Sequence, residues 1–185
     1  SIYRKETIES IHFNMDYTPY AKKRTLLIES FCKKLGIKCF IYEDYLLGPI
    51  GSFLKPNSQP YTVYTPFKNN VYDKKNLIPR VSRWRSFSFL KKNSLKSMKE
   101  SEYDLRKLYT QNNQAHVHGG RKVAQSLLTR AKSLSYDNNR NELSFETTNL
   151  SAFIKYGCVS IREVFHKLHE RKQGGICDQL IWREF

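Results

Sequence analysis

Residues 11–42 read IHFNMDYTPYAKKRTLLIESFCKKLGIKCFIY. A short alternating stretch comes first, and Thr18-Pro19 then opens a long run whose chemistry is typical of a helix start. The run ends at Gly36, and a second strand-like stretch follows at once. Two strands joined by one helix are normally parallel with a right-handed crossover. The segment therefore predicts an α/β fold.

Toward the C-terminus the pattern changes twice. Four prolines interrupt residues 49–66, and Thr65-Pro66 is typical of the start of one more helix, so residues 1–76 are interpreted as the end of an α/β domain. Residues 77–118 are polar and basic without a sustained period, which indicates an interdomain linker. After Gly119-Gly120 the apolar spacing becomes helical, so residues 119–185 are predicted to be all-helical.

The chain is strongly basic, and the charge is concentrated in its middle. Of 185 residues, 32 are Lys or Arg and 17 are Asp or Glu, and residues 68–136 alone hold 16 basic and 4 acidic side chains. Trp84, Phe87 and Phe89 lie within this segment. Because polyanions gain affinity from released counterions and aromatic faces stack on bases, nucleic acid is the predicted partner. A solvated basic face, or a lysine bias of the genome, would give the same charge.

The sequence holds few signals for a cellular compartment or for a metal site. The four cysteines form no closely spaced pair. The N-terminal residues carry charges where a secretory signal would be apolar, and no apolar run is long enough to span a membrane. A soluble intracellular protein is therefore expected. His116 with His118, and His166 with His169, could each supply two metal ligands, but nearby carboxylates or thiols to complete a site are missing. No metal site is predicted.

One short segment indicates a phosphate site. Thr147-Thr148-Asn149-Leu150-Ser151 stands directly before a predicted helix at residues 150–156, where hydroxyls and free backbone N–H groups can hold an anion. An ordinary helix cap explains the same residues, and on spacing alone it is the favoured interpretation.

Several motifs taken together resemble the DNA photolyase and cryptochrome family. They are Tyr136, Arg140, the segment 147–151, the segment FIKYGCVSIR at 153–162, and LIWREF at 180–185. Residues 14–24 and 60–67 resemble the end of that family's α/β domain. The resemblance implies the end of a doubly wound parallel α/β domain followed by the first helices of a helical FAD-binding domain.

The resemblance also assigns roles to residues. The FAD phosphates would be held by Tyr136, Thr147, Thr148, Asn149, Leu150 and Ser151. Damaged DNA would be faced by Arg140, Gln179, Trp182 and Arg183. Trp182 offers a flat apolar wall for an extruded pyrimidine pair, whereas its structural alternative is a core tryptophan. No catalytic side chain is predicted, because the cofactor carries the chemistry in such enzymes.

The implied activity is light-driven, flavin-dependent splitting of pyrimidine dimers in DNA. Family members that repair cyclobutane dimers have Glu where Gln179 stands, so the lesion type stays open between cyclobutane and (6-4) products. A blue-light-signalling cryptochrome is the alternative that Gln179 permits. A split or decayed gene product that binds DNA without catalysis is a third.

The chain begins at Ser1, and its last predicted helix runs to Phe185. Both ends favour a central fragment of the family, without the first strands and the later helices that enclose the flavin ring. The missing segments, as separate chains, would then be partners alongside dimer-containing DNA. Because residues 147–151 offer phosphate contacts only, the chain alone is expected to bind flavin weakly or not at all.

Overall fold

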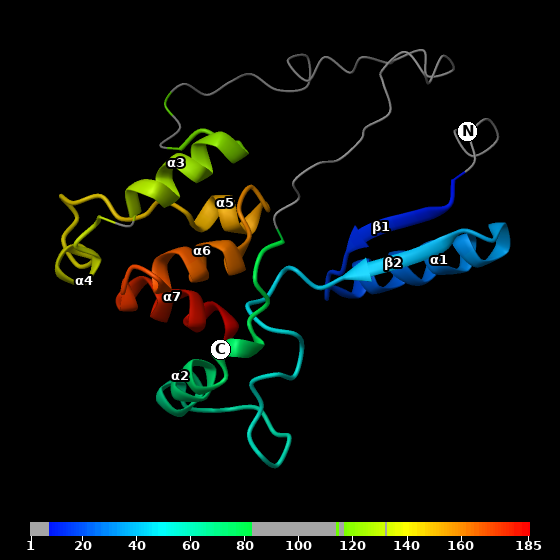
Figure 1. Cartoon of the computed structure of the whole chain (residues 1–185), viewed down its shortest axis with the longest axis horizontal. Coiled ribbons are helices and arrows are strands. Elements are labelled where there is room, and N and C mark those ends of the chain that lie inside the picture. The colour runs from blue at the N-terminus through cyan, green and yellow to red at the C-terminus, as the bar shows by residue number, and fades with distance from the viewer. Residues whose placement is uncertain (1–7, 83–113, 115–116, 132) are drawn as a thin grey trace. The chain divides into compact units, whose positions relative to one another are not determined.

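The computed structural model describes residues 8–82, Gln114, 117–131 and 133–185 (Figure 1). Its contacts divide the chain into two compact units. The described part of the first ends at Tyr42, with Ser82 and Gln114 grouped with it, and the second joins Glu43–Val81 to Val117–Phe185. Each unit is considered by itself.

The first unit is the predicted strand, helix and parallel strand. Strand β1 (Ser10–Asn14), helix α1 (Pro19–Leu35) and strand β2 (Lys38–Tyr42) follow one another along the chain (Figure 1). The strands pair in parallel, with Ser10 opposite Lys38 and Asn14 opposite Tyr42. The fold expected from residues 11–42 is therefore confirmed.

The ends of α1 have the expected local chemistry. The Thr18 Oγ1 accepts a hydrogen bond from the Ala21 backbone N–H at 3.3 Å, and Pro19 occupies the first turn, where its missing donor costs nothing. At the other end Gly36 adopts a left-handed conformation with φ of 68°, and its N–H bonds the Cys32 and Lys33 carbonyls. A side chain there would be strained, so glycine ends the helix.

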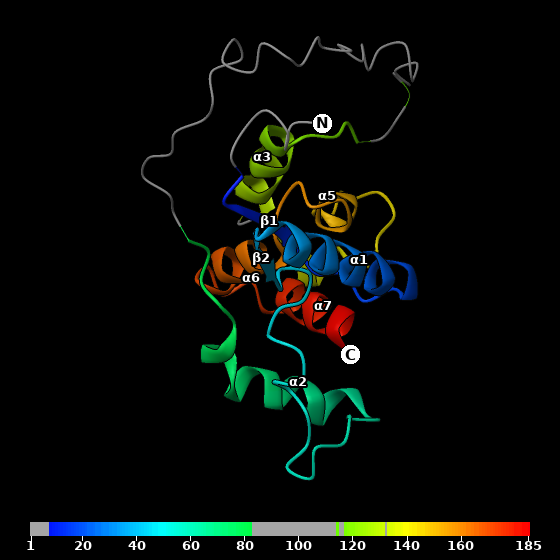
Figure 2. The same cartoon turned by 90° about the vertical axis from the view of Figure 1, so that its right-hand side faces the viewer.

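The second unit is helical. Its elements are α2 (Tyr64–Asp73), the 3₁₀ turn η2 (Lys75–Leu77), α3 (Arg121–Ala131), α4 (Tyr136–Asn139), α5 (Ser151–Lys155), α6 (Ile161–His169) and α7 (Gly174–Glu184). Helices α6 and α7 lie side by side in both views, and α2 packs against α7 (Figures 1 and 2). The predicted succession of α/β and all-α parts is confirmed.

Helix α6 is the centre of the second unit's core. Its residues Val164, Phe165 and Leu168 are fully buried and belong to one apolar cluster that also takes in the inner faces of α2, α3, α5 and α7. A capping box, in which the side chains of Ser160 and Glu163 would each bond the other's backbone N–H, is not complete at its start. Ser160 Oγ accepts from the Arg162 N–H at 3.3 Å, but Glu163 is bound by Arg121 and Lys167 instead of reaching back.

The sequence favours residues 43–76 as part of the α/β domain, yet in the structure these residues pack with the helical unit. Most of the predicted linker, including Trp84, Phe87 and Phe89, lies outside the described residues. The boundaries 1–76, 77–118 and 119–185 therefore stay a prediction. Every helix in the described ranges is too short or too polar to cross a bilayer.

Candidate functional site

A cavity of about 480 Å³ opens between α4, the segment before α5, and α7. It gathers residues from four separate parts of the sequence, all within the second unit. Its lining consists of Tyr136, Thr147, Thr148, Asn149, Leu150, Ser151, Ile154, Val164, Ile176, Gln179, Leu180 and Arg183. The six residues predicted to hold FAD phosphates and two of the four predicted to face DNA thus line one cavity.

The segment before α5 enters the cavity through a sharp backbone turn. Asn149 has a φ of 53°, a left-handed conformation that asparagine tolerates better than most side chains. Leu150, buried at 2% exposure, anchors the turn, and its N–H donates to the Thr148 Oγ1 at 3.4 Å. Helix α5 has five residues, shorter than the predicted 150–156, so its dipole is small and the hydroxyls carry the phosphate argument.

The opposite wall is α7, which α4 approaches closely. A Cβ atom added at Gly175 would overlap the Asp137 carboxylate, with the Asp137 Cγ 2.6 Å away. The absence of a side chain at Gly175 therefore allows α4, and with it Tyr136, to lie against the first turn of α7. The helix begins at Gly174.

The candidate residues of helix α7 lie on two faces rather than one. Gln179 and Arg183, four residues apart, line the cavity. Trp182 does not line it: its indole stacks on the Tyr64 ring of α2, with centroids 3.7 Å apart and planes 10° from parallel. The side chain is 48% exposed, so it is not a core tryptophan either.

Asp178 joins α7 to α2. The Tyr72 hydroxyl donates to the Asp178 Oδ1 at 2.7 Å, and the Lys68 Nζ lies 3.0 Å from Oδ2. The Tyr64 hydroxyl donates to the Asp178 carbonyl at 2.8 Å. Burial, followed by the neighbouring Asp178, raises the pKa of Tyr72 far above its usual range, so its hydroxyl stays a donor.

Sequence reasoning missed a basic cluster beside the cavity. The Arg183 guanidinium stacks over the Tyr45 ring at 4.5 Å and donates to the Tyr45 carbonyl at 2.9 Å. The Lys155 Nζ donates to the Tyr45 hydroxyl at 3.2 Å. These hydrogen bonds and charges, Lys155 first, lower the pKa of Tyr45. No local motif marks Tyr45, because both of its basic partners are more than a hundred residues away in sequence.

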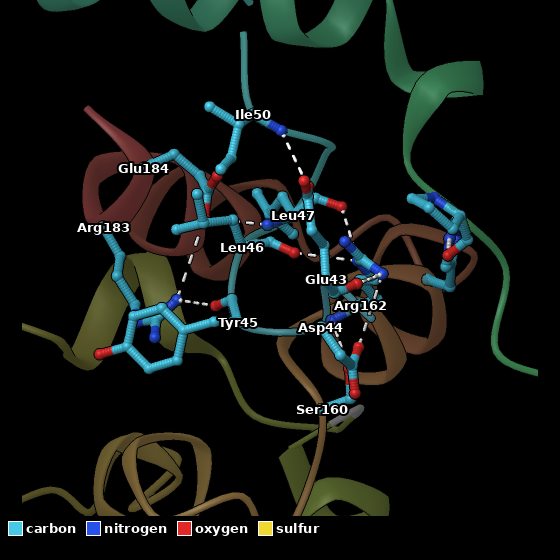
Figure 3. A network of polar contacts seen from close by, with 12 residues as sticks. Glu43, Asp44, Tyr45, Leu46, Leu47, Ile50, Ser160, Arg162, Arg183 and Glu184 are labelled. Atoms are coloured by element: carbon cyan, nitrogen blue, oxygen red, sulfur yellow. Dashed lines mark hydrogen bonds and ion pairs between the residues drawn. The ribbon is translucent and has the colours of Figure 1, made fainter. Parts of the chain in front are cut away.

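Arg162 fastens residues 43–47 to α6 (Figure 3). Its side chain is buried, and its Nε donates to the Leu46 and Leu47 carbonyls at 2.9 and 3.0 Å. Its Nη1 donates to the Glu43 carbonyl at 2.6 Å. From α7, the Glu184 Oε1 accepts the Leu47 N–H at 2.9 Å. Burial raises the pKa of Glu184.

Glu163 joins α6 to α3. Its carboxylate receives both terminal nitrogens of Arg121, at 2.6 and 3.1 Å, and Lys167 at 3.2 Å. Burial by itself raises the pKa of Glu163, but the hydrogen bonds from Arg121 and Lys167 outweigh it, and the pKa is lowered.

Because the pKa of Glu163 is lower in the folded state, its contribution to stability is full above the ordinary glutamate pKa and is lost as the pH falls through the lowered value. Glu163→Gln should cost about 1–2 kcal/mol at pH 7. Urea unfolding at pH 7, 5, 4 and 3 should show the gap to the wild type shrinking with acid. A gap that is constant over this range would contradict the assignment.

The remaining sequence candidates are not brought into the cavity. Arg140 is exposed and follows α4. The His166 ring nitrogen Nε2 bonds the Pro79 carbonyl at 3.1 Å, and His169 stacks on Phe165. His116 lies outside the described residues, and within the described ranges no three metal-binding side chains come together.

Comparison with known proteins fits this arrangement. The family model for DNA photolyase matches residues 1–83. An archaeal photolyase from Sulfolobus tokodaii, solved with two FAD molecules, superposes with a TM-score of 0.74 at 26% identity, over 97% of this chain and 38% of its own. The chain thus resembles the photolyase/cryptochrome family in sequence and in fold.

A cryptochrome and a further photolyase match over the full chain. Cryptochrome-1 of Aedes aegypti is 25% identical over 222 residues, which cover 100% of this chain and 41% of that protein. A class III photolyase from Agrobacterium tumefaciens shares the fold, with a TM-score of 0.71 at 16% identity over 100% of this chain and 41% of its own. The chain spans 38% to 41% of the length of these relatives.

Proposed function

We propose that this chain supplies the flavin-phosphate wall and part of the DNA-facing surface of a photolyase-type flavoprotein that splits pyrimidine dimers in DNA with light. The observation that carries the proposal is the cavity between α4 and α7. Residues that the family resemblance assigns to FAD lie together there, although they are spread over residues 136–151.

The residues present fit the phosphate part of FAD. Thr147, Thr148 and Ser151 contribute hydroxyls, which can donate to phosphate oxygens. Arg183 brings a positive charge to the same wall. When bound, reduced flavin would supply the light-excited electron that splits the dimer. The chain's own residues would hold and orient that group and exclude water from one side of it.

The DNA-facing role rests on α7 and on Arg140. Gln179 on the cavity wall can hydrogen-bond a pyrimidine edge through its amide. Trp182 would meet DNA from the adjacent face of the helix, outside the cavity, and the exposed Arg140 could contact a phosphate. The lesion would therefore lie over the end of α7 rather than wholly inside the cavity.

A second candidate is blue-light signalling of the cryptochrome type. It is favoured by the match to a cryptochrome over the whole chain and by the neutral amide of Gln179. An amide lacks the carboxylate charge found in enzymes that repair cyclobutane dimers. Repair assays on cyclobutane and (6-4) lesions, made with a protein that also contains the remaining family segments, separate the two functions.

Binding of FAD to this chain tests the cavity assignment directly. Equilibrium dialysis should detect weak FAD binding that ADP displaces and riboflavin does not, because the wall offers contacts to phosphates and not to the flavin ring. The double variant Thr147→Val and Thr148→Val should weaken binding at least about fivefold, since two hydroxyl hydrogen bonds are lost.

Thr129→Val is the matched control, because this exposed threonine donates to the Gln125 carbonyl within α3 and does not line the cavity. It should bind FAD like the wild type. Displacement by riboflavin as efficient as by ADP would overturn the phosphate-wall assignment, as would unchanged affinity in the double variant. Stoichiometric FAD retained through purification would contradict the expected weakness of binding.

A further inference from the structure

Trp182 is held by a partner from a distant part of the chain. Its indole lies parallel to the Tyr64 ring at a centroid separation of 3.7 Å, which is close stacking contact. Phe185 meets both rings edge-on, 5.7 Å from Trp182 and 5.8 Å from Tyr64. With one face covered and about half of the side chain still exposed, the indole has one face left to present to a ligand.

Tyr64 is itself fixed in place. Its hydroxyl donates to the Asp178 carbonyl at 2.8 Å, one helical turn before Trp182 on the same helix. Burial, followed by the nearby Asp178 carboxylate, raises the pKa of Tyr64 to about 12, so the hydroxyl keeps its proton. The ring is thus tied to α7 at two points, by the hydrogen bond to Asp178 and by the stack on Trp182.

We infer that Tyr64 is a positioning residue for Trp182, which fixes the indole so that its free face can stack on an unpaired pyrimidine of single-stranded or extruded DNA. The inference rests on the proposed DNA-facing role of α7. Stacking of a base on an aromatic side chain increases binding affinity. Less conformational entropy is lost on binding when the ring is already immobile. Tyr64 acts through Trp182 and does not itself touch the base.

The geometry separates this role from simple packing. Tyr72 also lies on α2, and its hydroxyl donates to the Asp178 carboxylate. Its ring lies near His169 and makes no ring contact with Trp182. Tyr72→Phe therefore loosens the joint between α2 and α7 without removing the stack. Tyr64→Leu removes the stack and the hydrogen bond, whereas Tyr64→Phe removes the hydrogen bond alone.

The test uses the full chain carrying Trp84→Phe, because Trp84 is the other of the two tryptophans. Fluorescence of Trp182 is then titrated with single-stranded oligothymidylate. The parent should be quenched on binding. Tyr64→Leu should bind about three- to tenfold more weakly with less quenching, Tyr64→Phe should fall between, and Tyr72→Phe should match the parent. Circular dichroism verifies that each variant is folded.

Acrylamide quenching of the free chain gives an independent readout. It should rise in Tyr64→Leu, where both indole faces become accessible, and stay unchanged in Tyr72→Phe. Equal accessibility and equal oligothymidylate affinity in Tyr64→Leu and the parent would overturn the inference. If the parent shows no quenching by oligothymidylate, the DNA-facing role of Trp182 is wrong, and acrylamide accessibility alone then decides whether Tyr64 positions the ring.

Discussion

Gly48→Ala is expected to destabilise the second unit by about 2–3 kcal/mol, because the added methyl group has no room. A Cβ atom at Gly48 would lie 2.7 Å from the Phe53 Cε2 and 2.8 Å from its Cζ. Phe53 is buried and meets the Phe67 ring edge-on, so its own ring has little freedom to move away. Urea unfolding followed by circular dichroism measures the loss.

Two further variants make this prediction specific. Gly174→Ala adds the same methyl group where no atom lies within 4 Å, and it should change stability by less than about 0.5 kcal/mol. Phe53→Leu removes the two atoms that the methyl group would strike. In that background Gly48→Ala should cost about 1 kcal/mol or less, since contacting residues are not additive. The same cost in both backgrounds would show that the Phe53 ring is not the obstacle.

The fold of residues 11–42 could be predicted because its signals are local. Helix α1 starts at a Thr18-Pro19 cap and ends at Gly36, and the alternation of the strands on either side sets their faces. Each of these signals acts within a few residues of its position. The parallel pairing of β1 with β2 then follows, because two strands joined by one helix are normally parallel.

The residues that line the cavity were singled out through the family resemblance and not through their own pattern. Residues 147–151 are consistent with an ordinary helix cap, and α5 proves too short to supply much of a dipole. What makes them a candidate site is their position in one cavity with Gln179 and Arg183, which depends on how α5, α6 and α7 pack. Periodicity along the sequence carries no information on that packing.

The orientation of Trp182 could not be predicted from the sequence either. Spacing places Gln179 and Trp182 on adjacent faces of one helix, but which face meets a cavity is decided by neighbouring elements. Tyr64, which covers the indole, is more than a hundred residues earlier. The predicted grouping of Gln179 to Phe185 as one DNA-facing surface is thus divided by the structure into a cavity wall and an aromatic stack.

Arg162 is the clearest residue that sequence reasoning could not single out. In the motif it stands next to a helix cap, where a solvated arginine is the ordinary expectation. Its three backbone acceptors, Glu43, Leu46 and Leu47, belong to a segment without helix or strand. Because residues 43–47 belong to no helix or strand, their backbone groups bond side chains of α6 and α7 instead.

Arg162→Met is expected to cost about 3 kcal/mol or more, because it leaves three carbonyl groups of residues 43–47 without their donor in a largely buried setting. The Asp44 carboxylate, 3.6 Å from the guanidinium, would lose its ion pair as well. The loss should spread to α7, since Arg183 and Glu184 bond the same segment at Tyr45 and Leu47 (Figure 3). Urea unfolding measures the total.

Hydrogen exchange locates the effect. The Leu47 N–H, which donates to Glu184, and the Ile50 N–H, which donates to the Glu43 carboxylate, should exchange faster in Arg162→Met. Arg130→Met is the matched control, because that arginine is half exposed and pairs with the exposed Glu146, so it should cost less than about 0.5 kcal/mol. Unchanged hydrogen exchange at the Leu47 and Ile50 amides, together with a small stability loss, would contradict the prediction. It would mean that α7 alone holds residues 43–47 and that Arg162 contributes little to stability.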